Sequence, residues 1–196
     1  RLSARDAGQV LKGFEITDSI SDGLLKIDGK ITGTGLKEVT KTNILIENFG
    51  VKDAPLFTQI LNATSLVGLV NTLRGKGIRF QTLRADVDFT PNKIEIKDSF
   101  ASGTSLGVST EGAIDRNSDQ ISIKGMIVPA YILNRIIDQI PVVGRILTGG
   151  KKEGLLAAEY LISGTRNEPE VSVNPLTAFT PGFLRAFVKA TRKPLE

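Results

Sequence analysis

The chain has 196 residues, 40% of them hydrophobic and 23% charged, a composition typical of a folded globular domain. It contains no cysteine and no histidine, which excludes disulfide frameworks, thiolate metal sites and catalysis by a histidine base. The net charge of +4 is interleaved with acidic residues and the aromatic share is only 6%, so no nucleic-acid partner is expected.

The first part of the chain alternates apolar and polar residues, the pattern of half-buried strands. Strands are predicted over residues 9–18, 24–32 and 37–49. Glycine-containing turns at residues 21–23 and 33–35 separate them. Three antiparallel strands are the simplest interpretation of this region.

The apolar spacing changes to a helical period after residue 53. Leu56, Ile60 and Val67 recur on one face, and Pro55 suits the first turn of a helix. We expect one helix of about five turns that ends near Gly75.

Alternation returns in the second half of the chain. Strands are predicted over residues 78–89, 93–100, 106–114, 120–128, 155–164 and 169–174. A second apolar helix is expected to open at Pro129 and to end near Pro141, and a short amphipathic helix is expected over residues 180–192. The sequence therefore predicts a mainly β fold with inserted helices. We expect a single elongated domain over residues 1–196, built on a twisted, curved, groove-like or taco-like antiparallel sheet that two or three helices cover or cap.

Three motifs have the spacing of chemical sites but lack essential residues. Residues 103–107 match a G-x-S-x-G elbow around Ser105, but no histidine is available as a base, and a strand follows instead of a helix. Residues 115–119 begin like a calcium loop without its later glycine and glutamate, and residues 144–152 have the wrong spacing for a phosphate loop. We expect turns at all three places, and no catalytic residue, cofactor or metal. A hydrolase with a Ser105–lysine pair is the enzymatic alternative.

Two segments are candidates for contact with lipid. The helix after Pro129 either packs in the core or lines a groove for acyl chains. Its candidate lipid-binding residues are Ile132, Leu133, Ile136, Ile137, Ile140 and Val143. The C-terminal segment is basic and amphipathic, and is typical either of helices on anionic membranes or of a docking helix. Its candidate membrane-surface residues are Phe183, Arg185, Phe187 and Lys189.

From residue 112 onward a series of short motifs resembles the C-terminal region of AsmA-like envelope proteins of Gram-negative bacteria. The series includes Val-Pro-Ala-Tyr at residues 128–131, Ile-Leu-Thr-Gly-Gly at residues 146–150, and Val-Asn-Pro-Leu at residues 173–176. It closes with Thr-Pro-Gly-Phe-Leu-Arg at residues 180–185. Members of this family are anchored in the inner membrane, cross the periplasm as curved β-sheets with an apolar groove, and are implicated in moving phospholipid.

The resemblance implies a non-catalytic periplasmic module of a longer protein that transports phospholipid toward the outer membrane or maintains that membrane. The inner-membrane anchor would lie in a segment absent from this chain, and the module would contact the outer membrane. Its partners would be phospholipid or a membrane surface, with an envelope protein left open as a further partner. The alternative is a structural or interaction module with a self-packed core and no lipid conduit.

Overall fold

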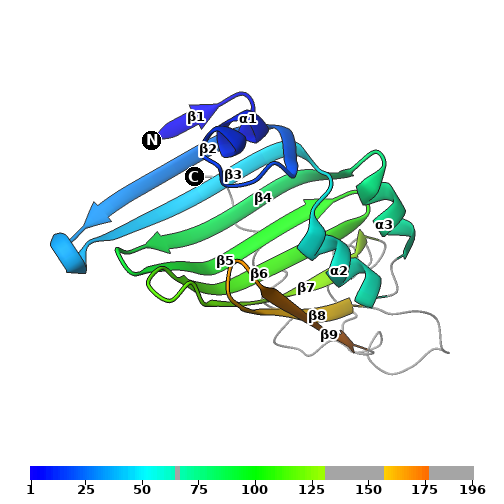
Figure 1. Cartoon of the computed structure of the whole chain (residues 1–196). Helices are drawn as coiled ribbons and strands as arrows, with labels where there is room; N and C mark the ends of the chain where they lie inside the picture. The colour runs from blue at the N-terminus through cyan, green and yellow to red at the C-terminus, as the bar shows by residue number, and fades with distance from the viewer. Residues whose placement is uncertain (65–66, 131–156, 177–196) are drawn as a thin grey trace, which may run out of the picture.

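The computed structural model describes residues 1–64, 67–130 and 157–176, and in them nine strands form one antiparallel sheet that does not close on itself (Figure 1). Each strand pairs with the next one along the chain, from β1 to β9. The strands are β1 (Leu2–Ala4), β2 (Ile20–Thr32), β3 (Val39–Val51), β4 (Ile78–Phe89), β5 (Lys93–Gly103), β6 (Leu106–Asp115), β7 (Ile121–Pro129), β8 (Ala157–Gly164) and β9 (Pro169–Leu176). The predicted mainly β, antiparallel fold is confirmed.

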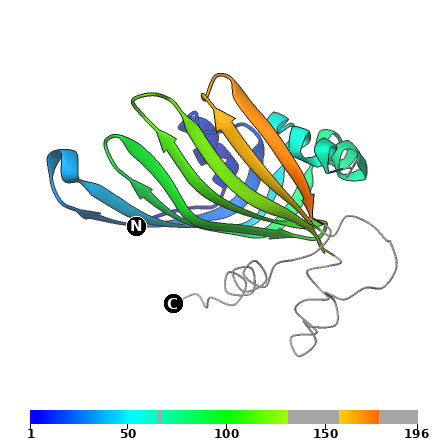
Figure 2. The same cartoon turned by 90° about the horizontal axis from the view of Figure 1, so that it is seen from below.

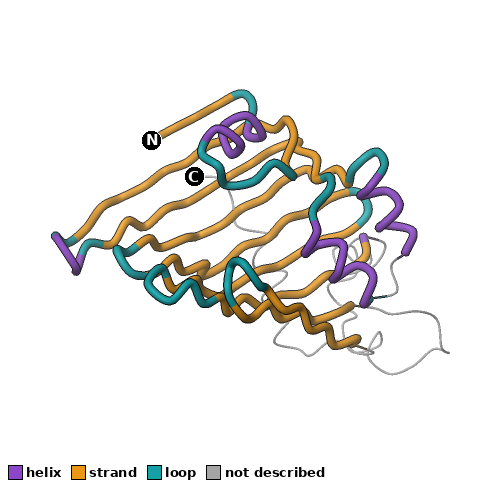
Figure 3. The backbone as a smooth tube through the Cα atoms, in the orientation of Figure 1, coloured by secondary structure: helices purple, strands orange, loops and turns teal. Residues whose placement is uncertain are grey.

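The two ends of this sheet are built differently (Figure 3). At one end, here called the turn end, short turns join β2 to β3, β4 to β5, β6 to β7 and β8 to β9. The first of these turns contains a single 3-10 turn, η1 (Gly35–Lys37). At the other end, the helix end, β5 and β6 are joined by a short turn, and two other connections carry the helices α1 (Ala7–Gly13), α2 (Pro55–Ala63) and α3 (Val67–Arg74). All three described α-helices therefore gather at one end of the strands.

The strand predicted over residues 9–18 is wrong, because this region forms α1. The Asp6 side chain caps the helix by accepting a hydrogen bond from the backbone N–H of Gln9, with an O–N distance of 3.0 Å. Ala7, Val10 and Leu11 have helical spacing and pack on the core. The apparent alternation continues through Phe14 and Ile16, and these lie in the loop after the helix with 71% and 66% of their surface exposed.

The single helix expected from residue 53 is instead two helices, α2 and α3. α2 ends at Thr64, whose hydroxyl donates to the carbonyl of Leu61 at 2.8 Å while its backbone N–H donates to the carbonyl of Ile60 at 3.1 Å. The hydroxyls of Thr58 and Thr72 also donate to nearby carbonyls but lie within α2 and α3, so the bond at Thr64 accompanies the helix end without by itself causing it. The apolar positions Ile60 and Val70 still point to the same core, so the face of the helix was predicted correctly and its continuity was not.

The core lies on one face of the sheet, here called the apolar face. Directly paired residues of neighbouring strands share a face, so Leu25 on β2, Ile46 on β3 and Leu83 on β4 lie side by side. The three helices lie on this face, with α1 against β2 and β3, α2 against β9 and α3 against β4 (Figure 2). The strands curve beneath them.

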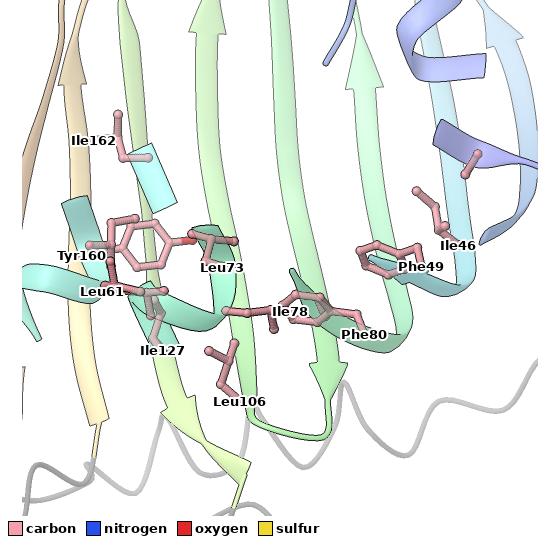
Figure 4. Close-up of a cluster of buried hydrophobic side chains, with 14 of the residues drawn as sticks. Ile46, Phe49, Leu61, Leu73, Ile78, Phe80, Leu106, Ile127, Tyr160 and Ile162 are labelled. Atoms are coloured by element: carbon pink, nitrogen blue, oxygen red, sulfur yellow. The ribbon is translucent and has the colours of Figure 1, made fainter. Parts of the chain in front are cut away.

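Under α2 and α3 the packing is tight. Leu61 and Leu73 from the two helices are fully buried against β-strand side chains that include Ile127 and Tyr160 (Figure 4). Phe49 and Phe80 stack at a ring-centroid distance of 5.3 Å. Their neighbour Phe57 on α2 packs on the same cluster. The helix end of the apolar face is therefore filled by the protein's own side chains.

Pro129, expected to open the second apolar helix, is the last residue of β7. The remainder of that predicted helix and the predicted helix over residues 180–192 lie outside the described residues.

Candidate functional site

The apolar face continues toward the turn end, beyond the helices. Phe89, Ile94, Ile114 and Ile121 are direct cross-strand partners on four successive strands, and form an apolar row across the sheet. One step nearer the helices, Val87 and Ile96 are also direct partners. Apolar side chains thus extend along the strands farther than the helices do (Figure 1).

We define the turn-end strip as the apolar side chains of this region that are not part of the core cluster beneath the helices. Its members are Ile31, Val87, Phe89, Ile94, Ile96 and Ile114. Ile31 is 64% exposed, Val87 is buried, and the other four are half-buried. Half-buried aliphatic side chains in a continuous row can gain free energy by contact with a further apolar group.

The strip is electrically neutral. The cross-strand partners that share the apolar face, from Leu25 on β2 to Val173 on β9, are apolar residues, glycine, serine, threonine or tyrosine, and none of them is charged. Thr42 and Ser99 on this face are buried hydroxyl residues. The described apolar face can therefore exclude water and hydrogen-bond a neutral polar group, and it offers no charge to bind an ion.

A pair of hydroxyl groups marks the border between the strip and the helix-covered core. The hydroxyl oxygens of Thr110 and Tyr160 are 2.7 Å apart, and the Tyr160 hydroxyl donates to the carbonyl of Ser109 at 2.9 Å. Burial raises the pKa of Tyr160 to about 12, while the hydrogen bond with Thr110 lowers it by a smaller amount. The phenol therefore stays neutral at physiological pH.

The opposite face of the sheet carries cross-strand ion pairs, together with the buried apolar side chains of Leu45, Phe100 and Val128. Lys97 lies 2.6 Å from a carboxylate oxygen of Asp88, and Lys124 lies 2.9 Å from one of Glu111. The hydrogen bond to each carboxylate raises the pKa of the lysine. This face is therefore charged in part, whereas the cross-strand partners on the apolar face carry no charge, which makes the apolar face the better surface for a hydrocarbon ligand.

The residues predicted from the sequence to contact lipid are not those of the turn-end strip. The six lipid-binding candidates from Ile132 to Val143 and the four membrane-surface candidates from Phe183 to Lys189 all lie outside the described residues. The strip residues on β4, β5 and β6 were missed as a site, although their alternation was recognised. Alternation shows that a strand has an apolar face, but it does not show which part of that face a helix covers.

Ser105 lies in the tight turn between β5 and β6, so the turn prediction is confirmed. Its backbone carbonyl accepts a hydrogen bond from the N–H of Ala130 at 2.9 Å. The elbow of a serine hydrolase is a turn from a strand into a helix, and here the turn joins two strands.

The turn after β6 is also confirmed. One carboxylate oxygen of Asp115 accepts hydrogen bonds from the backbone N–H groups of Asn117 and Ser118, at 2.9 and 2.8 Å, and from the Ser118 hydroxyl at 3.0 Å. These bonds lower the pKa of Asp115. The carboxylate thus stabilises the turn. In residues 1–64, 67–130 and 157–176 no group of three or more acidic side chains is arranged to hold a metal ion.

Comparisons of the chain with protein-family models, curated proteins and solved structures find no match. None of the helices in the described ranges is both long enough and apolar enough to span a lipid bilayer.

Proposed function

We propose that this chain is a non-catalytic lipid-binding module in which the turn-end strip binds the hydrocarbon part of a phospholipid. The observation that carries this proposal is the row formed by Phe89, Ile94 and Ile114, which extends an apolar sheet face beyond the helices that cover the rest of it. The module would belong to an AsmA-like protein that is anchored in the inner membrane, reaches into the periplasm, and transports phospholipid toward the outer membrane or maintains that membrane. The motif resemblance from residue 112 onward supports this assignment.

The energetics favour hydrocarbon over a polar ligand. Each methylene group removed from water contributes about 0.8 kcal/mol. A segment of about six methylenes on the strip would contribute about 5 kcal/mol before the cost of ordering the chain. The neutral hydroxyls of Thr42 and Ser99 on the same face suit an ester or glycerol group better than a free carboxylate.

The rival function is a structural or interaction module without a lipid conduit. It is favoured by the complete burial of Leu61 and Leu73, because α2 and α3 fill the helix end of the apolar face. Within the part of the chain that the structure describes, the turn-end strip distinguishes the two functions, since under the rival function it would pack against protein.

Native mass spectrometry with lipid extraction tests the proposal. The protein purified from bacterial membranes and from lysate should carry phospholipid, and the double variant Ile94→Gln/Ile114→Gln should carry at least tenfold less. Leu161→Gln is the matched control, because Leu161 is a 43% exposed apolar side chain on the face of β8 opposite the apolar face. Circular dichroism verifies that each variant is folded. A folded, lipid-free wild-type protein would favour the interaction module instead.

A further inference from the structure

The lysines of the described strands are paired with carboxylates except at one place. Lys26, Lys93, Lys97 and Lys124 each lie within 3.2 Å of an acidic side chain. Lys30 on β2 and Lys41 on β3 are instead direct cross-strand partners of each other, and neither forms an ion pair within the described residues. Like charges placed directly opposite each other destabilise a strand pair. On its other side Lys41 faces Asp88 on β4, whose carboxylate lies 2.6 Å from Lys97. An external anion beside Lys30 and Lys41 would therefore relieve the repulsion between them.

The same hairpin exposes its apolar side chains. Leu36, in η1 at the tip, is 82% exposed, and Ile31 at the end of β2 is 64% exposed. Lys37 beside Leu36 is exposed too, and Glu38 is the single acidic residue between Lys30 and Lys41. The hairpin reaches outward at the turn end of the sheet, away from α2 and α3 (Figures 1 and 2).

Protection of a sheet edge does not explain this combination. A lysine at an uncovered edge blocks pairing with other chains. β1 pairs with residues 25–27 of β2, so within the described residues Lys30 has a neighbouring strand on one side only. Lys41, however, lies on β3, which is paired on both sides, and Leu36 would promote association instead of preventing it. A partner that is both anionic and apolar accounts for all three residues.

We propose that the tip of the β2–β3 hairpin docks on the surface of an anionic phospholipid bilayer. Leu36 enters the boundary between headgroups and acyl chains, and Lys30, Lys37 and Lys41 bind the headgroup phosphates. The choice of a membrane as partner rests on the proposed function, but the residues that carry this inference differ from those of the strip, apart from Ile31.

The strand pairing of the hairpin is compatible with Leu36 at the acyl boundary and the lysines among the headgroups. Thr32 and Val39 form the last pair of the ladder, and the Lys30–Lys41 pair lies two residues behind it, about 7 Å along the strand. With Leu36 at the acyl boundary, both ammonium groups reach the headgroup layer. Ile31 belongs to the turn-end strip, and its partner Thr40 pairs onward with Phe89. A docked tip would therefore place one end of the strip at the lipid surface.

Fluorescence of single labels tests the docking. Because the chain has no cysteine, Leu36→Cys carries an environment-sensitive dye at one defined position. Asn167→Cys is the matched control, as an exposed position in the β8–β9 turn at the same end of the sheet. With vesicles of 70% phosphatidylcholine and 30% phosphatidylglycerol, the emission from position 36 should shift to the blue, while that from position 167 should stay as in water. Vesicles of pure phosphatidylcholine should have little effect on either.

The charge requirement is tested by vesicle binding of Lys30→Gln/Lys41→Gln. Removing two basic side chains that lie at an anionic surface should weaken binding about 30-fold. Folding should not suffer, because the substitutions remove a repulsion. Lys76→Gln, an exposed lysine between α3 and β4, is the control and should change binding less than twofold.

If the protein binds vesicles while the dye at position 36 stays in water, the docking proposal is overturned. Equal binding to neutral and to anionic vesicles would also overturn it. Neither result would affect the co-purification of lipid, which depends on Ile94 and Ile114. The reverse result, a docked tip on a protein that carries no lipid, would reject the proposed function and leave the docking surface in place.

Discussion

The phenol of Tyr160 on β8 occupies the space above Gly125, its direct cross-strand partner on β7. A β-carbon on Gly125 would lie 2.5 Å from the hydroxyl oxygen and 2.6 Å from Cζ of Tyr160, and would also collide with the carbonyl oxygen of Ser109. The missing side chain at residue 125 is what lets the tyrosine reach Thr110 and Ser109. An aromatic ring placed over a strand glycine in this way restores the packing that the glycine lacks.

Gly125→Ala should lower the free energy of unfolding by about 3 kcal/mol, since overpacking a filled core costs about 1–3 kcal/mol and here a backbone carbonyl must also move. Urea denaturation measures the change. Gly68→Ala is the control, because a β-carbon there meets no atom within 4 Å and Gly68 lies in the first turn of α3, where alanine has the better helix propensity. If both variants lose stability equally, the contact between Tyr160 and Gly125 is not the cause.

The raised pKa of Tyr160, about 12, makes stability depend on alkaline pH. A group whose pKa is higher in the folded state stabilises the fold fully below its unfolded pKa of about 10, and this contribution is lost as the pH rises through the folded pKa. We therefore expect a loss of stability between about pH 10 and pH 12 that is smaller in Tyr160→Phe.

Absorbance at 295 nm follows tyrosinate formation directly. One component of the wild-type titration should appear near pH 12 and should be missing from Tyr160→Phe. At neutral pH the variant should lose about 1 kcal/mol, because the hydroxyl bonds to Thr110 and Ser109 disappear. A late component that persists in the variant would contradict the assignment.

Asp115→Ala should make the stability less dependent on acidic pH. The hydrogen bonds from Ser118 and Asn117 lower the pKa of Asp115, so the carboxylate stabilises the folded state above its unfolded pKa of about 4, and the contribution is lost as the pH falls through the lower folded value. The difference in melting temperature between wild type and Asp115→Ala should therefore be largest near neutral pH and should shrink in acid. A difference that is constant with pH would assign the effect to geometry and not to the charge.

Leu73→Ala on α3 should lower the free energy of unfolding by about 3 kcal/mol, because Leu73 is fully buried and the substitution leaves a cavity beneath the helix. Leu36→Ala is the matched control, since the same change at an 82% exposed leucine should alter stability by less than about 0.5 kcal/mol. Guanidinium denaturation measures both. A small effect at Leu73 would mean that α3 is not needed to hold the sheet.

The alternation of apolar and polar residues was enough to predict the mainly β fold and most of its strands. In β2, Leu25 and Ile27 alternate with Lys26 and Asp28, and a period of two fits a strand with one buried face and no helix. Strand β4 was predicted at its observed bounds, Ile78–Phe89, because both ends carry clear turn signals. For these strands the local pattern of apolar and polar residues was enough to predict the secondary structure.

Short-range signals misled in three places. The turn predicted at residues 21–23 lies inside β2. The loop residues Phe14 and Ile16 extended an apparent alternation that belongs to no strand, although Asp6 caps the helix α1 in this region. The continuous apolar spacing also concealed that α2 ends at Ala63, with Thr64 as its cap, and that α3 is a separate helix from Val67.

Only the tertiary structure decided which apolar residues are covered. Leu83 and Phe89 alternate identically along β4, yet Leu83 packs against the core cluster and Phe89 lies in the turn-end strip. The difference arises because α2 and α3, which leave from the end of β3 and return at the start of β4, lie over the helix end of the sheet alone. The register likewise places Lys124 opposite Glu111, and Lys41 between Lys30 and Asp88, because cross-strand neighbours are far apart in the sequence.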